Sequence, residues 1–339
     1  GPKLPEFEKK ISKYCNVSFT VATNSATSAL HLACMALSVG PSDIVWTSPN
    51  SFVATSNCAL YCGAKIDFVD IDPLTYNISI KKLKEKLKLC EIKGNLPKVL
   101  IPVHFAGLPC DMKEIHKLSK KYNFSVIEDA SHAIGSLYLN NKIGNCKYSD
   151  ITVFSFHPVK IITSAEGGAA VTNNNELDNK MRILRSHGIT KDQEKFHYPT
   201  NKPWQYEQHL LGFNYRITEL QAALGITQLN KIDKFIRKRN EIAKIYDNEL
   251  ANLNIQLPYI NKNCLSSYHL YVINLNETEN THKNIFQALR SFGINVNLHY
   301  TPIHLQPFYK NLGFKEGDYV VSENYAKRAI SLPIFPKLK

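Results

Sequence analysis

A lysine lies between an apolar stretch and a pair of glycines. Residues 154–160 read Phe-Ser-Phe-His-Pro-Val-Lys, and Glu166-Gly167-Gly168 follows shortly after Lys160. The apolar residues predict a strand that leads into a turn at Pro158, and the glycines let the backbone pass close to a bulky group. A desolvated lysine amine in such a place can bond covalently to a carbonyl compound. A solvated surface lysine is the alternative.

Two carboxylates, Glu128 and Asp129, end another apolar stretch, and Ala130-Ser131-His132 follows them. Successive side chains of a strand point to opposite faces, so only one of the two carboxylates can serve a given site. A carboxylate in this position can keep a heterocyclic nitrogen protonated, which increases electron withdrawal by the ring. The alternative is a helix N-cap, a frequent role for Asp after a strand.

Small hydroxyl residues open a predicted helix at residues 23–30, which read Thr-Asn-Ser-Ala-Thr-Ser-Ala-Leu. The first N–H groups of such a helix, its dipole and the hydroxyls of Thr27 and Ser28 form an anion site suited to a phosphate. An ordinary Ser/Thr-rich helix start has the same pattern. A further polar segment, residues 212–219 (Gly-Phe-Asn-Tyr-Arg-Ile-Thr-Glu), precedes a long helical region, and a helix-entry loop is its simplest interpretation.

Strand-like and helix-like segments alternate through the first two-thirds of the chain and must position these groups. The predicted strands are residues 18–22, 44–47, 65–69, 98–103, 124–128, 151–154 and 169–172. The predicted helices between them are residues 26–37, 52–62, 80–89 and 112–122. This alternation predicts an α/β fold with a mainly parallel sheet covered on both faces. Catalytic groups in such sheets gather at the carboxyl ends of the strands.

The pattern changes after Ile217. A helical region with apolar spacing covers residues 218–250, and a strand (270–275), a helix (282–292) and an extended piece (295–300) follow. We expect a large domain over residues 1–228 and a smaller C-terminal α+β domain over residues 229–339, joined through one long helix.

Composition restricts the class of protein. The chain has 339 residues, is 44% hydrophobic and has no apolar run long enough to span a membrane. Its start lacks the apolar stretch of a secretory signal, so we expect a cytoplasmic protein. The eight cysteines are scattered without zinc spacing, which predicts buried reduced thiols and no metal site. The net charge of +12 has no nucleic-acid-binding motif beside it, although a positive field would attract an anionic nucleotide.

Taken in order, these segments resemble the DegT/DnrJ/EryC/StrS sugar aminotransferases, which are fold type I enzymes dependent on pyridoxal 5′-phosphate (PLP). The hydroxyl-rich helix start, Glu-Asp-Ala-Ser-His, Phe-Ser-Phe-His-Pro-Val-Lys with Glu-Gly-Gly, and Gly-Phe-Asn-Tyr-Arg all occur in the family's order. The resemblance covers essentially the whole chain and implies a mainly parallel seven-stranded sheet. It also implies that family members extend beyond both Gly1 and Pro336.

The resemblance implies a role for each catalytic candidate. Lys160 would hold PLP covalently and act as the acid and base of the proton shift. The dehydratases of the family have histidine in place of this lysine, so the presence of Lys160 implies an aminotransferase. Asp129 would pair with the pyridine nitrogen, and His132 would lie beside the ring and its hydroxyl. Phe52 would stack on the cofactor.

It also implies how the cofactor phosphate is held. Thr27, Ser28 and Ser155 would bind the phosphate within one subunit. Asn214 would reach the phosphate in a neighbouring subunit, so the resemblance predicts a homodimer with shared sites.

A narrower resemblance within the family concerns residues 24–31, 52–60, 185–189 and 299–302. It implies transfer of an amino group from glutamate to C4 of a UDP-linked 4-keto-6-deoxy-N-acetyl-hexosamine, in pseudaminic acid biosynthesis. His299, Tyr300, Thr301 and Pro302 would hold the nucleotide sugar. Another nucleotide-linked keto sugar, with dTDP or GDP, is one alternative. A nucleic-acid-binding protein that keeps the fold is another, and it conflicts with the intact Lys160 and Asp129.

Overall fold

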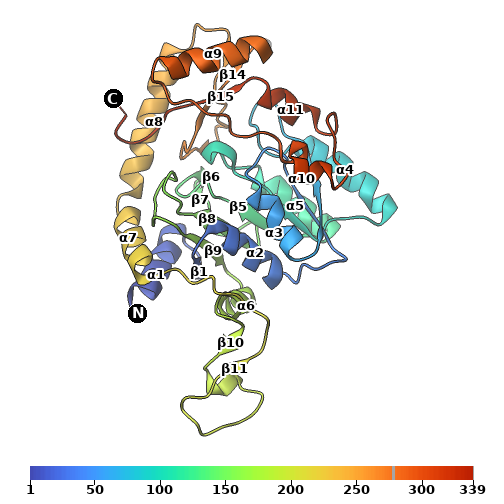
Figure 1. Cartoon of the computed structure of the whole chain (residues 1–339), viewed down its shortest axis with the longest axis vertical. Helices are drawn as coiled ribbons and strands as arrows, with labels where there is room; N and C mark the ends of the chain where they lie inside the picture. The colour runs from blue at the N-terminus through green and yellow to red at the C-terminus, as the bar shows by residue number, and fades with distance from the viewer. Residues whose placement is uncertain (277–278, 339) are drawn as a thin grey trace.

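The computed structural model describes residues 1–276 and 279–338, and its centre is a seven-stranded sheet (Figure 1). In spatial order the strands are β1 (Phe19–Thr23), β9 (Gly168–Thr172), β8 (Ile151–Ser155), β5 (Ser125–Asp129), β4 (Val99–Ile101), β2 (Ile44–Thr47) and β3 (Lys65–Phe68). Strand β9 is antiparallel to both neighbours, and the other pairs are parallel. The predicted α/β fold with a mainly parallel sheet is confirmed.

Helices cover both faces of the sheet because alternate strand residues point to opposite sides. The helices on one face are α1 (Lys3–Cys15), α4 (Ile80–Lys93), α5 (Met112–Tyr122) and α7 (Glu219–Leu229), whose apolar residues pack with Trp46, Leu100, Val126 and Phe154. The helices on the other face are α2 (Ala26–Ala36), α3 (Ala54–Tyr61) and α6 (Asn175–Arg185), which pack with Val45, Ile127 and Val153.

Two helix predictions need correction. The single long helix expected over residues 218–250 is two helices, because α7 ends at Leu229 and α8 (Ile232–Glu249) begins after Asn230 and Lys231. Asparagine has low helix propensity, since its side chain competes with the backbone for hydrogen bonds. The helix expected from residue 52 begins at Ala54, which leaves Phe52 in the preceding turn.

The C-terminal elements form a second, smaller sheet with its own core. Its strands are β12 (Ile255–Gln256), β14 (Tyr271–Leu275) and β15 (Ala329–Leu332), with β14 in the centre. Side chains of α8 and α9 (Glu279–Ser291) pack with this sheet around buried Tyr271 and Ile330. The expected extended piece at 295–300 contributes a bridge between Asn297 and Ser331. The division of the chain at residues 228 and 229 stays a prediction.

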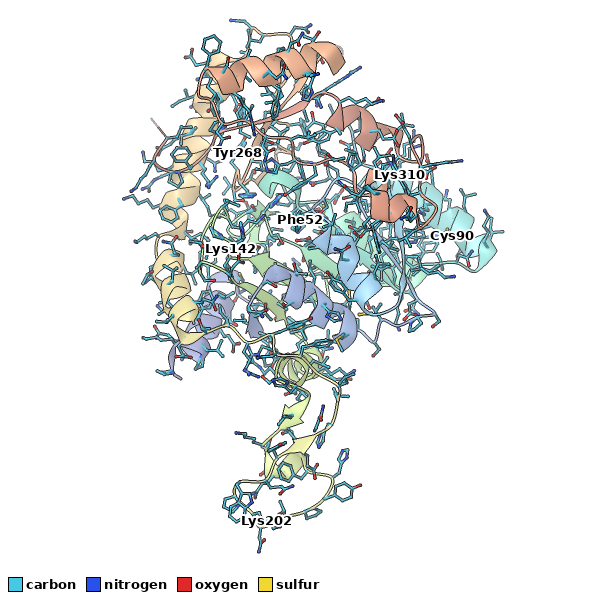
Figure 2. All side chains as sticks on the ribbon, viewed as in Figure 1. Phe52, Cys90, Lys142, Lys202, Tyr268 and Lys310 are labelled. Atoms are coloured by element: carbon cyan, nitrogen blue, oxygen red, sulfur yellow. The ribbon has the colours of Figure 1, made fainter. Side chains whose placement is uncertain are left out.

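A segment that the sequence did not single out projects away from the body. We call residues 189–211 the arm; it contains β10 (Ile189–Thr190), which pairs with β11 (Glu207–Gln208), and the short helix η2 (Gln193–Lys195). Figure 1 shows the arm extending past α6, and Figure 2 shows Lys202 at its far end. The arm therefore presents its side chains away from the central sheet.

The remaining elements are short or peripheral. They are β6 (Leu137–Tyr138), β7 (Asn141–Lys142), β13 (Cys264–Leu265), η1 (Phe105–Gly107), η3 (Ile303–Leu305), α10 (Pro307–Lys310) and α11 (Val320–Ala326). Among the described residues, none of the helices combines the length and apolar character needed to cross a membrane. The cysteines are free thiols as predicted, but Cys62, Cys90 and Cys264 are only partly buried.

Candidate active site

A cavity of about 350 Å³ lies at the carboxyl ends of β5 and β8, next to the start of α2. We call it the Lys160 cavity. The predicted site residues that line it are Thr27, Phe52, Asp129, His132, Ser155, Lys160 and Tyr300. Phe52 is labelled in Figure 2, between the central sheet and the C-terminal elements. Residues far apart in sequence therefore meet at the edge of the sheet where α/β proteins bind ligands.

Lys160 lies in the turn that follows β8, and its amine points into buried surroundings. Burial lowers the pKa of Lys160 to about 8, although the nearby negative charge of Asp129 acts in the opposite direction. The amine nitrogen lies 3.5 Å from Nε2 of His269. A lysine with this pKa has a substantial neutral fraction near neutral pH, which a nucleophile and proton acceptor requires.

The structure distinguishes the two carboxylates at the end of β5. Glu128 points away from the Lys160 cavity, where it accepts hydrogen bonds from His104 Nε2 (2.7 Å) and Thr152 Oγ1 (3.0 Å). Burial would raise the pKa of Glu128, but the hydrogen bond and charge of His104 together with the hydrogen bonds from Ser149 and Thr152 hold the pKa below its ordinary value. Asp129 faces the Lys160 cavity. Strand alternation thus gives Glu128 a structural role and leaves Asp129 for the ligand.

A chain of hydroxyls holds Asp129 in place. Thr55 Oγ1 donates to Asp129 Oδ2 at 2.6 Å, and Ser51 Oγ lies 2.7 Å from Thr55 Oγ1. The backbone N–H of Ser131 donates to the other carboxylate oxygen at 3.1 Å. These contacts fix the orientation of the Asp129 carboxylate before any ligand binds.

His132 is buried, and its contacts define its protonation state. Burial and the nearby charges of Lys160 and His299 hold the pKa of His132 well below its ordinary value. Its Nδ1 accepts the backbone N–H of Ala106 at 3.3 Å, so the neutral ring carries its proton on Nε2. This nitrogen lies 3.1 Å from the Tyr300 hydroxyl, to which it donates. The Tyr300 hydroxyl proton is consequently available to a ligand.

The start of α2 forms one end of the Lys160 cavity. Ser25 caps the helix by accepting the backbone N–H of Ser28 at 3.1 Å, and the first N–H groups, those of Ala26 and Thr27, have no partner within the helix. A Cβ atom at Gly168 would lie 2.5 Å from the backbone of Ser25, so only glycine lets β9 pass this close to the helix start. The arrangement can bind a phosphate through backbone N–H groups and the helix dipole.

Some predicted residues lie elsewhere. The Ser28 hydroxyl donates to Asn24 Oδ1 at 2.6 Å and does not line the Lys160 cavity. Asn214 is exposed outside it, Thr301 is exposed, and Pro302 is buried ahead of η3. The Ser28 hydroxyl is used within the start of α2, and Asn214, Thr301 and Pro302 lie in loop segments.

His299 lines an adjoining cavity of about 720 Å³ that shares Val159 and Lys160 with the first. Its Nδ1 lies 2.8 Å from Ser331 Oγ. Lys160 thus lies between two cavities, one of which contains Asp129 and the other His299.

Comparison with known proteins agrees with this geometry. Residues 1–339 match the DegT/DnrJ/EryC1/StrS aminotransferase family. The chain belongs to this family. It is a PLP-dependent sugar aminotransferase with the fold type I architecture.

Two relatives in this family illustrate the similarity. The UDP-4-amino-4,6-dideoxy-N-acetyl-beta-L-altrosamine transaminase of Campylobacter jejuni is 42% identical over 98% of this chain and 85% of its own length. PseC of Helicobacter pylori, an aminotransferase of pseudaminic acid biosynthesis, is 34% identical with a TM-score of 0.89, and the match covers 100% of this chain and 87% of that one.

A third relative bears on the cofactor. Spr1654 of Streptococcus pneumoniae, solved in its PLP form, is 30% identical with a TM-score of 0.89 over 100% of this chain and 88% of that one. The Lys160 cavity fits the same cofactor. An amine for the cofactor carbonyl, a carboxylate for its ring nitrogen and a helix start for its phosphate all border one space, as Lys160, Asp129 and Thr27.

Sequence reasoning missed two residues that support this sugar aminotransferase site. Thr55 lies three residues after Phe52, in the first turn of α3, so a hydroxyl close to a predicted site residue was visible in the sequence. His269 lies 109 residues from Lys160 in the chain. No local pattern joins them, because their contact depends on how the C-terminal elements pack.

Proposed function

We propose that this enzyme transfers an amino group from glutamate to C4 of a UDP-linked 4-keto-6-deoxy-N-acetyl-hexosamine, within cytoplasmic pseudaminic acid biosynthesis. The observation that carries the reaction type is the meeting of Lys160 and Asp129 in one cavity beside the start of α2. Support for the substrate comes from the Campylobacter jejuni relative, which is 42% identical. The GDP-perosamine synthase of Caulobacter vibrioides is 33% identical, so a GDP-linked sugar is the alternative.

When bound, PLP supplies an electrophilic carbonyl and a ring that withdraws electrons from the reacting carbon. We assign Lys160 to the carbonyl of the cofactor. We assign the start of α2, together with Thr27 and Ser155, to the cofactor phosphate. Ser28 orders this helix start through its hydrogen bonds to Asn24 and Ser25. The exposed ring of Phe52 would cover one face of the cofactor.

Lys160 carries the proton in both halves of the reaction. In the first half its neutral amine would accept the proton from Cα of glutamate and pass it to the carbon that was the cofactor carbonyl. In the second half the amine would take a proton from that carbon and deliver it to C4 of the sugar. The pKa of about 8 suits both directions, because each protonation state is populated near neutral pH.

Asp129 would hold the ring nitrogen of the cofactor and keep it protonated, while Thr55 and Ser131 hold the carboxylate in place. His132 keeps its proton on Nε2 and orients Tyr300, whose hydroxyl can donate to the ring substituent or to the substrate. His299, Tyr300, Thr301 and Pro302 form the segment that we assign to the nucleotide sugar.

We also propose a homodimer in which Asn214 reaches the cofactor phosphate of the second subunit. Asn214 is exposed, and the next residue lies beside the start of α2, since Asn24 N donates to Tyr215 O at 2.9 Å. The arm supports the same proposal because it presents exposed aromatic residues, including Trp204 with 75% of its surface exposed.

The absorbance of the purified holoenzyme tests both the reaction and the substrate. We expect glutamate to bleach the visible band of the bound cofactor and the UDP-linked 4-keto sugar to restore it. Restoration by GDP- or dTDP-linked keto sugars instead would replace the substrate assignment and keep the aminotransferase. A band that glutamate leaves unchanged would refute glutamate as the donor.

A further inference from the structure

Three metal-binding side chains gather on the arm, away from the Lys160 cavity. The donor atoms of His197, Glu207 and His209 all lie within 4.8 Å of one another. Glu207 and His209 are two residues apart at β11, so their side chains share a face. His197 follows η2 and joins them from the opposite side of the loop.

The carboxylate of this trio is held in place by the backbone. The N–H groups of His197 and Tyr198 donate to Glu207 Oε2 and Oε1 at 2.7 and 2.9 Å. These two hydrogen bonds give the carboxylate a fixed orientation.

The two imidazoles lie face to face. The ring centroids of His197 and His209 are 4.3 Å apart, with 12° between the planes. The 2.7 Å contact between His209 Nε2 and Glu207 Oε2 explains the position of His209. It does not explain His197, whose exposed ring has no hydrogen-bond partner in the described part of the chain. Stacking on His209 explains the orientation of the His197 ring and leaves its two nitrogens open to a ligand.

We propose that His197, Glu207 and His209 bind one divalent transition-metal ion, with Zn²⁺ as the best match. Zinc takes imidazole and carboxylate ligands at about 2.0–2.2 Å, which places tetrahedral ligand atoms about 3.3 Å apart. Rotation of the exposed His197 side chain, with a smaller adjustment of the partly buried His209 and Glu207, would bring the trio from its present spacing to that distance. Water completes the coordination.

The bound ion would join the two ends of the loop 198–206. This loop contains Tyr198, Trp204 and Tyr206, which are all exposed. A metal that closes a flexible loop removes conformational entropy from it. The ion thus holds these aromatic side chains in one arrangement, whatever reaction the Lys160 cavity performs.

Titration of the purified holoenzyme with Co²⁺, followed by displacement with Zn²⁺, tests the site. We expect one Co²⁺ per chain, a visible ligand-field spectrum, and quenching of Trp204, one of only two tryptophans. The other, Trp46, is buried within the sheet. Zn²⁺ should reverse the quenching, because it competes for the same ligands.

Variants identify the ligands. His197→Ala and His209→Ala should each weaken Co²⁺ binding by at least about 100-fold, since a zinc site loses a directly bonded ligand. His187→Asn is the matched control; it removes an exposed histidine at the base of the arm, and Asn tolerates the positive φ of 62° there. Its affinity should equal that of the wild type.

Two outcomes would overturn the proposal. One is the absence of saturable Co²⁺ or Zn²⁺ binding by the wild-type protein. The other is unchanged binding in His197→Ala and His209→Ala, which would assign the metal to other groups, such as the partly buried Cys62 thiol. Circular dichroism and the visible cofactor band confirm that each variant is folded.

Discussion

The Lys160 cavity and the arm differ in how their side chains are held. Around the cavity, Asp129 is fixed by Thr55 and His132 by Tyr300, so residues from separate parts of the chain constrain one another. On the arm, Tyr198 and Leu211 are each 81% exposed, and the contacts among its polar groups are local. The side chains of the Lys160 cavity are held in place by other residues of the same chain, whereas the exposed side chains of the arm are available to bind a metal ion or a second subunit.

The largest expected effect concerns Lys160. Lys160→Ala should reduce transamination by at least about 10⁴-fold, because covalent attachment and proton transfer depend on the same amine. The free energy of unfolding should stay the same or rise, since a buried amine is removed. Steady-state kinetics and urea unfolding measure the two. Turnover near the wild-type rate would contradict the assignment of Lys160.

The second prediction is that substitutions of the adjacent carboxylates Asp129 and Glu128 have different effects. Asp129→Asn should lower kcat by about 10²–10³-fold with little change in stability, because the ring nitrogen loses its carboxylate. Glu128→Gln should instead cost about 1–3 kcal/mol of unfolding free energy, since it disturbs the buried contact with His104, while activity stays within about threefold. The opposite pattern would mean that the roles of the two residues are reversed.

The pH dependence of cofactor attachment is the third prediction. In the cofactor-free protein, the rate at which Lys160 bonds to added PLP should rise about tenfold per pH unit below the pKa and level off above it. The rise should end near pH 8, since burial lowers the pKa of Lys160 to about 8. The appearance of the visible band gives the rate. A rise that continues to pH 10 would contradict the lowered pKa.

A smaller effect on catalysis should follow from loss of the hydrogen bond that Thr55 donates to Asp129. Thr55→Val removes the hydrogen bond to the carboxylate and should lower kcat about tenfold, with KM for the sugar unchanged. Ser51→Ala, one contact further away, should have a smaller effect. If both variants act mainly on KM, the hydroxyls contact the substrate instead.

The smallest effect on stability should come from the arm. Trp204→Ala should leave the unfolding free energy of the chain within about 0.5 kcal/mol, because this side chain is exposed. It should nevertheless weaken self-association by about tenfold in sedimentation experiments. Leu253→Ala is a control with an exposed apolar side chain outside the arm. Equal self-association of Trp204→Ala and the wild type would exclude Trp204 from the dimer contact.

Sequence reasoning predicted the sheet well because its strands are short apolar runs between clear breaks. It also proposed Lys160, which lies in the turn after β8, and Asp129, which is the last residue of β5. It failed at the break between α7 and α8, where Asn230 and Lys231 interrupt an otherwise continuous apolar periodicity. It also missed the arm, whose residues have little apolar periodicity because they do not pack on a core.

Taken alone, the sequence determined the α/β fold and the candidate lysine and carboxylates, because strand periodicity and turn residues act over a few neighbouring positions. The family resemblance favoured Asp129 over Glu128, and the tertiary structure showed that Asp129 faces the Lys160 cavity while Glu128 points away from it. Only the tertiary structure brought His269 to Lys160 across 109 residues and placed His197 beside His209. Such contacts depend on how separate elements pack, and no local pattern of residue types encodes that packing.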